Sequence, residues 1–159
     1  MLILFAALGA ASQIHYRDIT LPEVVAASPT IVVVDDADPA SRTISLPAGP
    51  VTMETRLMRL VVVDVLQAPE GQVSPGQVIE VGRANLEMQR MMVWRYHADG
   101  ISKSPIYQRY QGPEVDGRRV VFLAPCGTPG DEPGLCLSVS GGVESLEKQA
   151  EITALITGE

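Results

Sequence analysis

Aromatic residues and histidines are scarce in this chain, and their scarcity limits the chemistry that it can perform. The 159 residues include seven aromatic residues and two histidines, His15 and His97. A catalytic triad needs a nucleophile, a base and an orienting group within hydrogen-bond reach, and histidine is the most common base. The chain also lacks a G-x-S-x-G turn to present a serine, and a glycine-rich loop with the lysine that holds phosphates. We therefore expect a protein that is not an enzyme and that binds no cofactor.

Long apolar runs are also missing. A transmembrane helix needs about 20 consecutive apolar residues. The apolar run at the N-terminus spans only Leu2 to Leu8, and small residues follow it, as in a secretory signal peptide. We expect residues 1–12 to be a signal peptide, and hence a secreted or periplasmic protein whose mature chain has no membrane span. The alternative is that this run is a buried strand.

Basic residues are fewer than acidic ones. Twelve lysines and arginines stand against nineteen aspartates and glutamates, for a formal net charge of −7. Binding to DNA or RNA depends on a basic face that displaces counterions, so we expect no nucleic-acid partner. The composition is otherwise ordinary for a folded protein, and the length suits one hydrophobic core. We therefore expect residues 13–159 to form a single domain.

The chain has only two cysteines, Cys126 and Cys136, which bracket the turn-rich stretch GTPGDEPGL. Both can lie at the base of one hairpin loop, within reach of a disulfide bond. A zinc site is the alternative, but the two thiols are too far apart in sequence for a zinc knuckle and no histidine pair lies nearby. We predict a disulfide and no metal site.

A capping box marks the first predicted helix. Thr20 can cap the helix, Glu23 stands three residues later, and Pro22 suits the first turn. The helix must end before Pro29, because the residue before a proline leaves the helical region. The apolar run from Ile31 to Val34 then predicts a buried strand that ends at the carboxylates following it.

The remaining apolar segments predict further strands and a C-terminal helix. Strands are predicted from Thr55, over Val78 to Val81, over Arg118 to Ala124, and from Leu135 as the hairpin partner of the preceding strand. A helical stripe near the C-terminus contains Val143, Leu146, Ala150, Thr153 or Ala154, and Ile156. The pattern is typical of a mainly β protein: a small five-stranded barrel with a short N-terminal helix and a C-terminal helix.

Three phrases carry a resemblance to a known group: LPEVVAASPTIVVVDD, RLVVVDVLQAPEGQVSPGQVIEV and GRRVVFLAP. In these phrases the chain resembles exported bacterial proteins with an OB-fold barrel similar to the netrin-module and tissue-inhibitor-of-metalloprotease (NTR/TIMP-like) fold. The resemblance covers Leu21 to Gly142, apart from a loop that looks inserted near 84–113. It implies an OB-like barrel and no particular activity. The inhibitors of that group use an N-terminal cysteine, and no cysteine stands near Ala11 to Gln13, so their mechanism does not carry over.

Aromatic and basic residues gather in one part of the chain. The segment WRYHADGISKSPIYQRY, from Trp94 to Tyr110, holds four of the seven aromatic residues, and Arg83 to Arg119 holds seven of the twelve basic ones. Aromatic residues and arginine are enriched in interface hot spots, and methionines add adaptable apolar contact. We predict that the segment from Met88 to Tyr110 recognises a protein partner, through Met91, Met92, Trp94, Arg95, Tyr96, Tyr107, Arg109 and Tyr110. The alternative is that the methionines and Trp94 fill the open side of the barrel and that the tyrosines cover an edge of the core.

Two further hypotheses remain open. One is a hydrolase or metal-dependent activity centred on His97 and Asp99, together with the carboxylates of Asp35, Asp36 and Asp38. These carboxylates lack the twelve-residue pattern of a calcium loop, and solvated turn residues are the simpler interpretation. The other hypothesis is that the chain is a subunit of a larger cell-envelope assembly, since a partner surface and a subunit contact look alike in a sequence.

Overall fold

The computed structural model describes residues 15–99, 106–127 and 132–159, so the predicted signal peptide at residues 1–12 lies outside the described residues. The strands are β1 (His15–Ile19), β2 (Thr30–Ala48), β3 (Val51–Gln67), β4 (Val78–Gly82), β5 (Ile106–Tyr110), β6 (Arg119–Pro125), β7 (Leu135–Leu137) and β8 (Val143–Glu144). The helices are α1 (Leu21–Ala26), α2 (Leu86–Asp99) and α3 (Gln149–Thr157), and a 3-10 turn, η1 (Leu146–Lys148), precedes α3. The mainly β class is confirmed, but the described part of the chain has eight strands instead of the five predicted.

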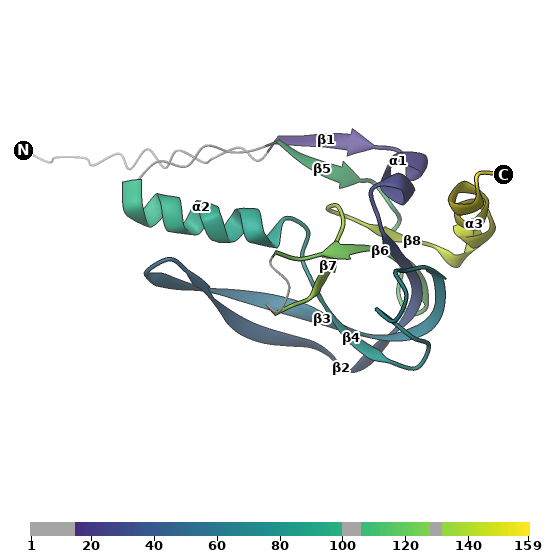
Figure 1. Ribbon diagram of the computed structural model, residues 1–159, viewed down its shortest axis with the longest axis horizontal. Helices are drawn as coiled ribbons and strands as arrows, with labels where there is room; N and C mark the ends of the chain where they lie inside the picture. Colours follow the sequence, from purple (N-terminus) through teal and green to yellow (C-terminus); the bar gives the residue numbers. More distant parts are fainter. Residues whose placement is uncertain (1–14, 100–105, 128–131) are drawn as a thin grey trace, which may run out of the picture.

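Six of the strands form one sheet, in the order β2-β3-β4-β7-β6-β8. Strand β2 also pairs with β6, so the pairing that starts at β2 passes through β3, β4, β7 and β6 and returns to β2. The β4–β7 pair is parallel and the other pairs of this sheet are antiparallel. Strands β1 and β5 form a separate parallel pair, which lies above and to the right of α2 in Figure 1.

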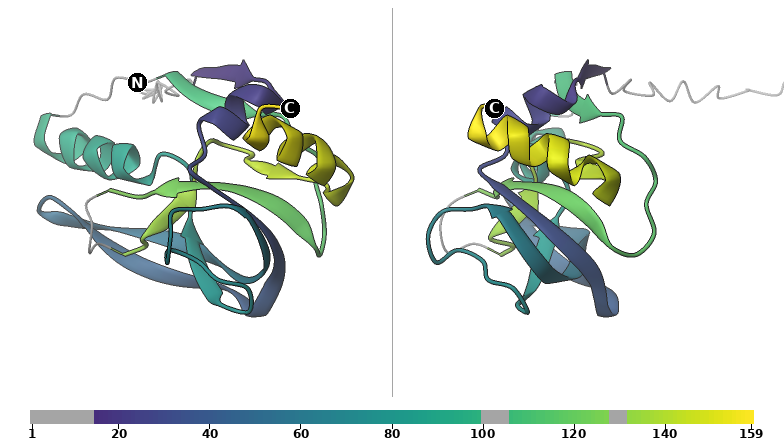
Figure 2. Two further views of the ribbon diagram at one scale, coloured as in Figure 1. Left: turned by 45° about the vertical axis from the view of Figure 1, so that its right-hand side comes forward. Right: turned by 90° about the vertical axis from the view of Figure 1, so that its right-hand side faces the viewer.

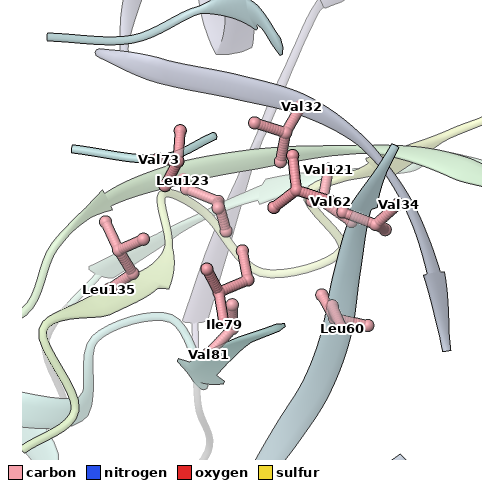
Figure 3. Packing of buried hydrophobic residues seen from close by; sticks show 10 residues of the cluster. All are labelled: Val32, Val34, Leu60, Val62, Val73, Ile79, Val81, Val121, Leu123 and Leu135. Carbon is pink, nitrogen blue, oxygen red and sulfur yellow. The ribbon is translucent and has the colours of Figure 1, made fainter. Parts of the chain in front are cut away.

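Near its start, after Thr30, strand β2 has four apolar residues, Ile31 to Val34, that are buried on alternate faces of the sheet. Val32 and Val34 belong to a cluster inside the sheet, where ten apolar side chains pack together (Figure 3). Ile31 and Val33 point to the opposite side and pack with residues of α1, α3 and β6. Figure 2 shows α1 and α3 side by side over this outer face. Burial on both faces explains why the sequence from Ile31 to Val34 is continuously apolar instead of alternating.

The predicted end of this strand was wrong. The carboxylates after Val34 do not terminate β2, which continues to Ala48 and pairs with β3 as a long hairpin. The pairing register shifts between Asp36 and Ser41, as in a β-bulge. A bulge turns polar residues away from the ladder of hydrogen bonds without ending the strand. The polar Asp-Pro stretch in this bulge therefore resembles a strand end when only the sequence is considered.

The helices predicted near the two ends of the chain, α1 and α3, are both confirmed. The residues predicted to form the buried side of α3 were partly wrong. In α1, the Glu23 carboxylate accepts hydrogen bonds from the Thr20 backbone N–H, at 2.7 Å, and from the Thr20 hydroxyl, at 3.0 Å. In α3 the fully buried residue is Ile152, whereas Leu146 of the predicted stripe is 36% exposed and lies in η1. A 3-10 turn has three residues per turn instead of 3.6, which shifts the helical phase that the prediction extended across it.

The predicted disulfide is present. Cys126 and Cys136 are bonded, with their Cα atoms 5.3 Å apart, and both are buried. The bridge lies at the base of the β6–β7 hairpin, where Ala124 is paired with Cys136. Gly82 of β4 lies against it, because a Cβ added there would be 2.9 Å from Cys136 Sγ and 2.9 Å from Pro133 Cγ.

This close packing predicts that Gly82→Ala destabilises the protein. The added methyl group has no space beside the disulfide, so we expect the free energy of unfolding to fall by about 1–3 kcal/mol in urea denaturation. Gly134→Ala is the matched control, because a Cβ at Gly134 meets nothing within 4 Å. It should change the free energy of unfolding by less than about 0.5 kcal/mol. Equal midpoints for the two variants would contradict this account of the packing.

Candidate interaction surface

The segment predicted to be an inserted loop contains helix α2 and strand β5. Helix α2 runs between the β1–β5 pair and the β2–β3 hairpin (Figure 1). Its first residue, Leu86, is buried and packs with Leu46 and the two cysteines. Apolar residues also lie on its outer side, so the helix has no single apolar stripe in the sequence. This is why the usual periodicity did not identify it.

Two side chains of α2 hold it against the tip of the β2–β3 hairpin. Arg90 Nε donates a hydrogen bond to the backbone oxygen of Pro47, at 3.0 Å, and Arg90 Nη1 pairs with Glu87 Oε1 at 2.6 Å. The Trp94 indole lies directly over Gly49, because a Cβ added to Gly49 would be 2.0 Å from Trp94 Cδ1. The helix is therefore fixed to the hairpin at its first residue, Leu86, and further along, at Arg90 and Trp94.

The outer side of α2 exposes large apolar side chains. Met88 is 36% exposed, Met91 is 50% exposed and Trp94 is 49% exposed, and Arg95 beside them is also exposed. Residues three and four apart on a helix are neighbours on its surface, so these four side chains form one continuous patch. We call this patch the α2 face. It contains three of the predicted binding residues, Met91, Trp94 and Arg95.

Tyr107 and Met92 form the contact between α2 and β5 instead of an exposed surface. Tyr107 is 6% exposed, and its hydroxyl donates to Met92 Sδ at 3.2 Å. Its ring lies 6.1 Å from the ring of Tyr16 on β1. Burial, with a smaller contribution from Tyr16, raises the pKa of Tyr107 above its ordinary value. Tyr107 is therefore part of the packing between α2, β1 and β5 and is not an exposed binding residue.

Arg109 makes contacts within the protein. Its Nε donates to Asp18 Oδ1 at 2.9 Å, and its guanidinium carbon lies 5.0 Å from the centre of the Tyr16 ring. The hydrogen bond from Arg109 lowers the pKa of Asp18, and Gln111 donates to the other carboxylate oxygen at 2.7 Å. Arg109 therefore joins β5 to β1.

Tyr110 joins β5 to the main sheet. Its hydroxyl donates to Glu144 Oε1 at 2.7 Å, its backbone N–H donates to the Ser140 oxygen at 2.8 Å, and its ring meets Phe122 edge-on at 6.0 Å. Glu144 is 5% exposed, so this hydrogen bond compensates for the burial of its carboxylate. Burial, followed by the hydrogen bond to Glu144, raises the pKa of Tyr110 well above its ordinary value.

The predicted binding residues thus divide between two roles. Met91, Trp94 and Arg95 are exposed together on α2, whereas Met92, Tyr107, Arg109 and Tyr110 attach α2 and β1 to the rest of the fold. The side chains of Tyr96, His97 and Asp99 lie outside the described residues. Gly49 at the hairpin tip was not predicted to contact this segment, although the Gly-Pro pair between two polar-apolar alternating stretches is a turn signal.

Two of the three carboxylates in the acidic cluster on β2, those of Asp35 and Asp36, are engaged in ion pairs. Arg118 Nη2 lies 2.7 Å from Asp35 Oδ2, and Arg119 Nη2 lies 2.8 Å from Asp36 Oδ1. The hydrogen bonds from Arg118 lower the pKa of Asp35. Asp35 and Asp36 therefore fasten β2 to the start of β6. Within residues 15–99, 106–127 and 132–159, no three histidine, cysteine, aspartate or glutamate side chains are grouped to hold a metal ion.

A shallow cleft of about 380 Å³ lies between β4, β7 and the β2–β3 hairpin. The charged groups around it pair with one another. Arg42 Nε lies 2.6 Å from Glu80 Oε2, and Arg42 Nη2 lies 3.8 Å from Glu132 Oε2. One arginine therefore pairs with both glutamates that line the cleft, and these pairs occupy its charged groups.

In comparisons with known proteins, the chain matches no protein-family model, no curated protein and no solved structure. None of the helices in the described part of the chain is long and apolar enough to cross a membrane.

The contact between Trp94 and Gly49 predicts a change in fluorescence. Gly49 and Gly71 both have positive φ angles, +65° and +74°, so alanine at either position strains the backbone by about 1 kcal/mol. Only Gly49→Ala also displaces an indole, because nothing lies within 4 Å of a Cβ at Gly71. Trp94 is the one tryptophan of the chain, so we expect its emission to shift to the red in Gly49→Ala and to stay unchanged in Gly71→Ala. Identical spectra would show that Trp94 does not lie on the hairpin tip.

The raised pKa of Tyr110 predicts a loss of stability at alkaline pH. The ordinary pKa of a tyrosine phenol is 10.0. Near this pH the Tyr110 phenol ionises in the unfolded chain, while it stays protonated in the folded state. A group whose pKa is raised on folding supplies its stability below the unfolded value and loses it as the pH rises toward the folded value. The free energy of unfolding should therefore decrease above about pH 10, and less steeply in Tyr110→Phe. Denaturant titrations on both sides of this pH test the slopes, and equal slopes would contradict the prediction.

Proposed function

We propose that this chain is an exported, noncatalytic binding module that recognises a protein partner through the α2 face. The observation that carries the proposal is the exposure of Met88, Met91 and Trp94 on one side of a helix, next to Arg95. Tryptophan and arginine are enriched among the residues that dominate binding energy, and methionine adapts its shape to a partner. Contiguous exposed apolar side chains with a polar border are typical of interaction sites.

The contacts that hold α2 against the rest of the fold support this function. Leu86 is anchored in the small core around the disulfide, and Arg90 and Trp94 contact the hairpin tip. A surface that is already ordered before binding loses less conformational entropy when a partner binds. The hydrogen bond from Tyr107 to Met92 supports the helix from its other side.

We infer that the scaffold is an OB-like barrel, as the resemblance to the NTR/TIMP-like group implies. The support is the closed course of strand pairing from β2 through β3, β4, β7 and β6 back to β2, with β4 and β7 parallel. Strand β8 and the β1–β5 pair are additions to these five strands. The OB fold is a five-stranded Greek-key barrel that presents binding surfaces in many unrelated proteins, so the fold agrees with a binding role and does not specify a ligand.

We also infer that the protein functions outside the cytoplasm. The apolar N-terminal run followed by small residues suits a signal peptide, and the bonded pair Cys126 and Cys136 suits an oxidising compartment. The ion pairs of Asp35 and Asp36 with Arg118 and Arg119 favour the binding role over a metal-dependent activity at that cluster.

Site-specific photocrosslinking tests the proposed function. A benzophenone amino acid in place of Met91 lies on the α2 face and should form a covalent adduct with a partner protein in the cells that produce the chain. The same amino acid in place of Leu146 is the matched control, because Leu146 is 36% exposed in η1, directly before α3, and α3 lies at the opposite end of the molecule from α2 in Figure 1. We expect a discrete adduct from position 91 and none from position 146.

Melting curves and circular dichroism of both proteins serve as the control for folding. Adducts of the same mass from both positions, or from neither while the proteins are folded, would contradict the proposed function. An adduct with the mass of two copies of the chain would identify the α2 face as a subunit contact.

A further inference from the structure

This inference rests on the proposed function and concerns the regulation of the α2 face. We propose that the disulfide controls this face: bonded Cys126 and Cys136 hold helix α2 in its binding position, and reduction of the bond to two thiols releases the helix. The evidence is the packing of the first turn of α2 against the bridged end of the β6–β7 hairpin.

The small core beneath the first turn of α2 consists largely of the disulfide. It has four buried residues, Leu46, Leu86, Cys126 and Cys136, so half of them are the bonded cysteines. The two main clusters have ten and nine buried residues, and none of these is a cysteine. Leu86 is the one buried residue among 86–95, the part of α2 whose side chains are described. The apolar attachment of α2 therefore depends on the disulfide more than any other part of the fold does.

Gly82 shows how tightly this site is filled. A Cβ added to Gly82 would lie 2.9 Å from Cys136 Sγ and 3.2 Å from Leu86 Cδ2. Reduction breaks the Sγ–Sγ bond, and the two thiol sulfurs must then separate to nonbonded contact. Protein interiors are close-packed, so a change of this kind displaces the neighbouring side chains. Leu86 is the neighbour that belongs to α2.

Glu87 forms a second link between the bridged hairpin and the helix. Its side chain lies over Gly127, next to Cys126, because a Cβ added to Gly127 would be 2.6 Å from Glu87 Cδ. Glu87 Oε1 accepts a hydrogen bond from Arg90 at 2.6 Å, and Arg90 Nε donates to the Pro47 oxygen at 3.0 Å. A movement of Cys126 and Gly127 therefore also disturbs the polar contacts that join α2 to the β2–β3 hairpin.

Backbone pairing alone holds the end of the β6–β7 hairpin weakly. Strand β7 has three residues and pairs with β4 at two positions. Pro125, at the end of β6, has no N–H to contribute to the ladder. Beyond it, the Cys126 N–H donates to the Gly134 oxygen at 3.1 Å. The covalent bond between the two strands is therefore what fixes the hairpin end, and with it the site that receives Leu86.

The redox step is an exchange between thiols and a disulfide. When the bond forms, the two cysteine thiols lose two protons and two electrons to an external disulfide, which becomes a dithiol, and a dithiol reductant reverses the exchange. Thiols are kept reduced in the cytoplasm and are oxidised outside it. The α2 face of an exported chain therefore forms after export, and the chain binds no partner through this face before export.

Hydrogen–deuterium exchange of helices α2 and α3 tests the inference. The purified oxidised protein is compared with the same protein in dithiothreitol, and peptides from both helices are followed by mass spectrometry. Reduction should speed the exchange of α2 amides at least about tenfold. The exchange of α3 should stay unchanged, because α3 packs on α1 and the outer core instead of on the disulfide. A variant with Cys126→Ser and Cys136→Ser controls for the reductant, and its α2 should exchange fast with and without dithiothreitol.

A second pair of variants tests the packing with the disulfide intact. Leu86→Ala removes the side chain that packs with the cysteines, and should speed the exchange of α2 amides at least about tenfold without affecting α3. Leu155→Ala is the matched control, because Leu155 lies on α3 and packs on the outer core. It should speed the exchange of α3 and leave α2 unchanged.

Photocrosslinking connects the bond to binding. The chain with the benzophenone amino acid at position 91 should lose its adduct in cells when Cys126→Ser and Cys136→Ser are added. Circular dichroism verifies that this variant is folded. An adduct of undiminished yield from the serine variant would overturn the inference and would still support the proposed function.

The exchange experiment has two further outcomes that overturn the inference. Unchanged exchange of α2 on reduction would show that the bond does not hold the helix. Equal acceleration in α2 and α3 would show that the bond supports the whole fold and does not regulate one surface. An absent adduct from the chain that retains both cysteines would instead contradict the proposed function, and the exchange of α2 would still report whether the bond holds the helix.

Discussion

The structure depends on one constraint, the burial of β2 on both of its faces. Val32 and Val34 fill the interior of the sheet, while Ile31 and Val33 support α1 and α3 on its outer side. The same strand pairs with β3 along one edge and with β6 along the other. A polar residue at any of these four positions would leave an unsatisfied group in one of the two cores. The sheet, both terminal helices and the position of the β2–β3 hairpin therefore all follow from this short apolar run.

The features that could be predicted from the sequence are those determined by local chemistry. The capping box at Thr20 and Glu23 set the start of α1, the two cysteines within one turn-rich stretch indicated the disulfide, and the buried strands were visible as β-branched runs. Each of these signals lies within a few neighbouring residues. Long-range context adds little to them, and the structure agrees with them.

The features that could not be predicted are those in which tertiary contacts decide. The outer half of β2 follows a bulge at Asp36 to Ser41, whose Asp-Pro composition resembles a strand end. Helix α2 is apolar on two sides, because Leu86 contacts the core and Met91 faces outward, so its periodicity was obscured. For the same reason, the roles of the residues in the aromatic segment from Trp94 to Tyr110 could be predicted only in part. Its composition indicated a surface, but only the fold separates Trp94, which is exposed, from Tyr107, which is buried.

The α2 face and the core share almost no residues. The exposed side chains of α2 contribute to neither of the two main apolar clusters, and the helix is held through Leu86 and Arg90 outside the face and, within the face, through Trp94 over Gly49. Substitutions at exposed positions away from packing contacts usually change stability little. Met88, Met91 and Arg95 can therefore diverge between related lineages while the scaffold, with Trp94 on the hairpin tip, remains constant, so natural variation should be concentrated at these exposed positions of one helix.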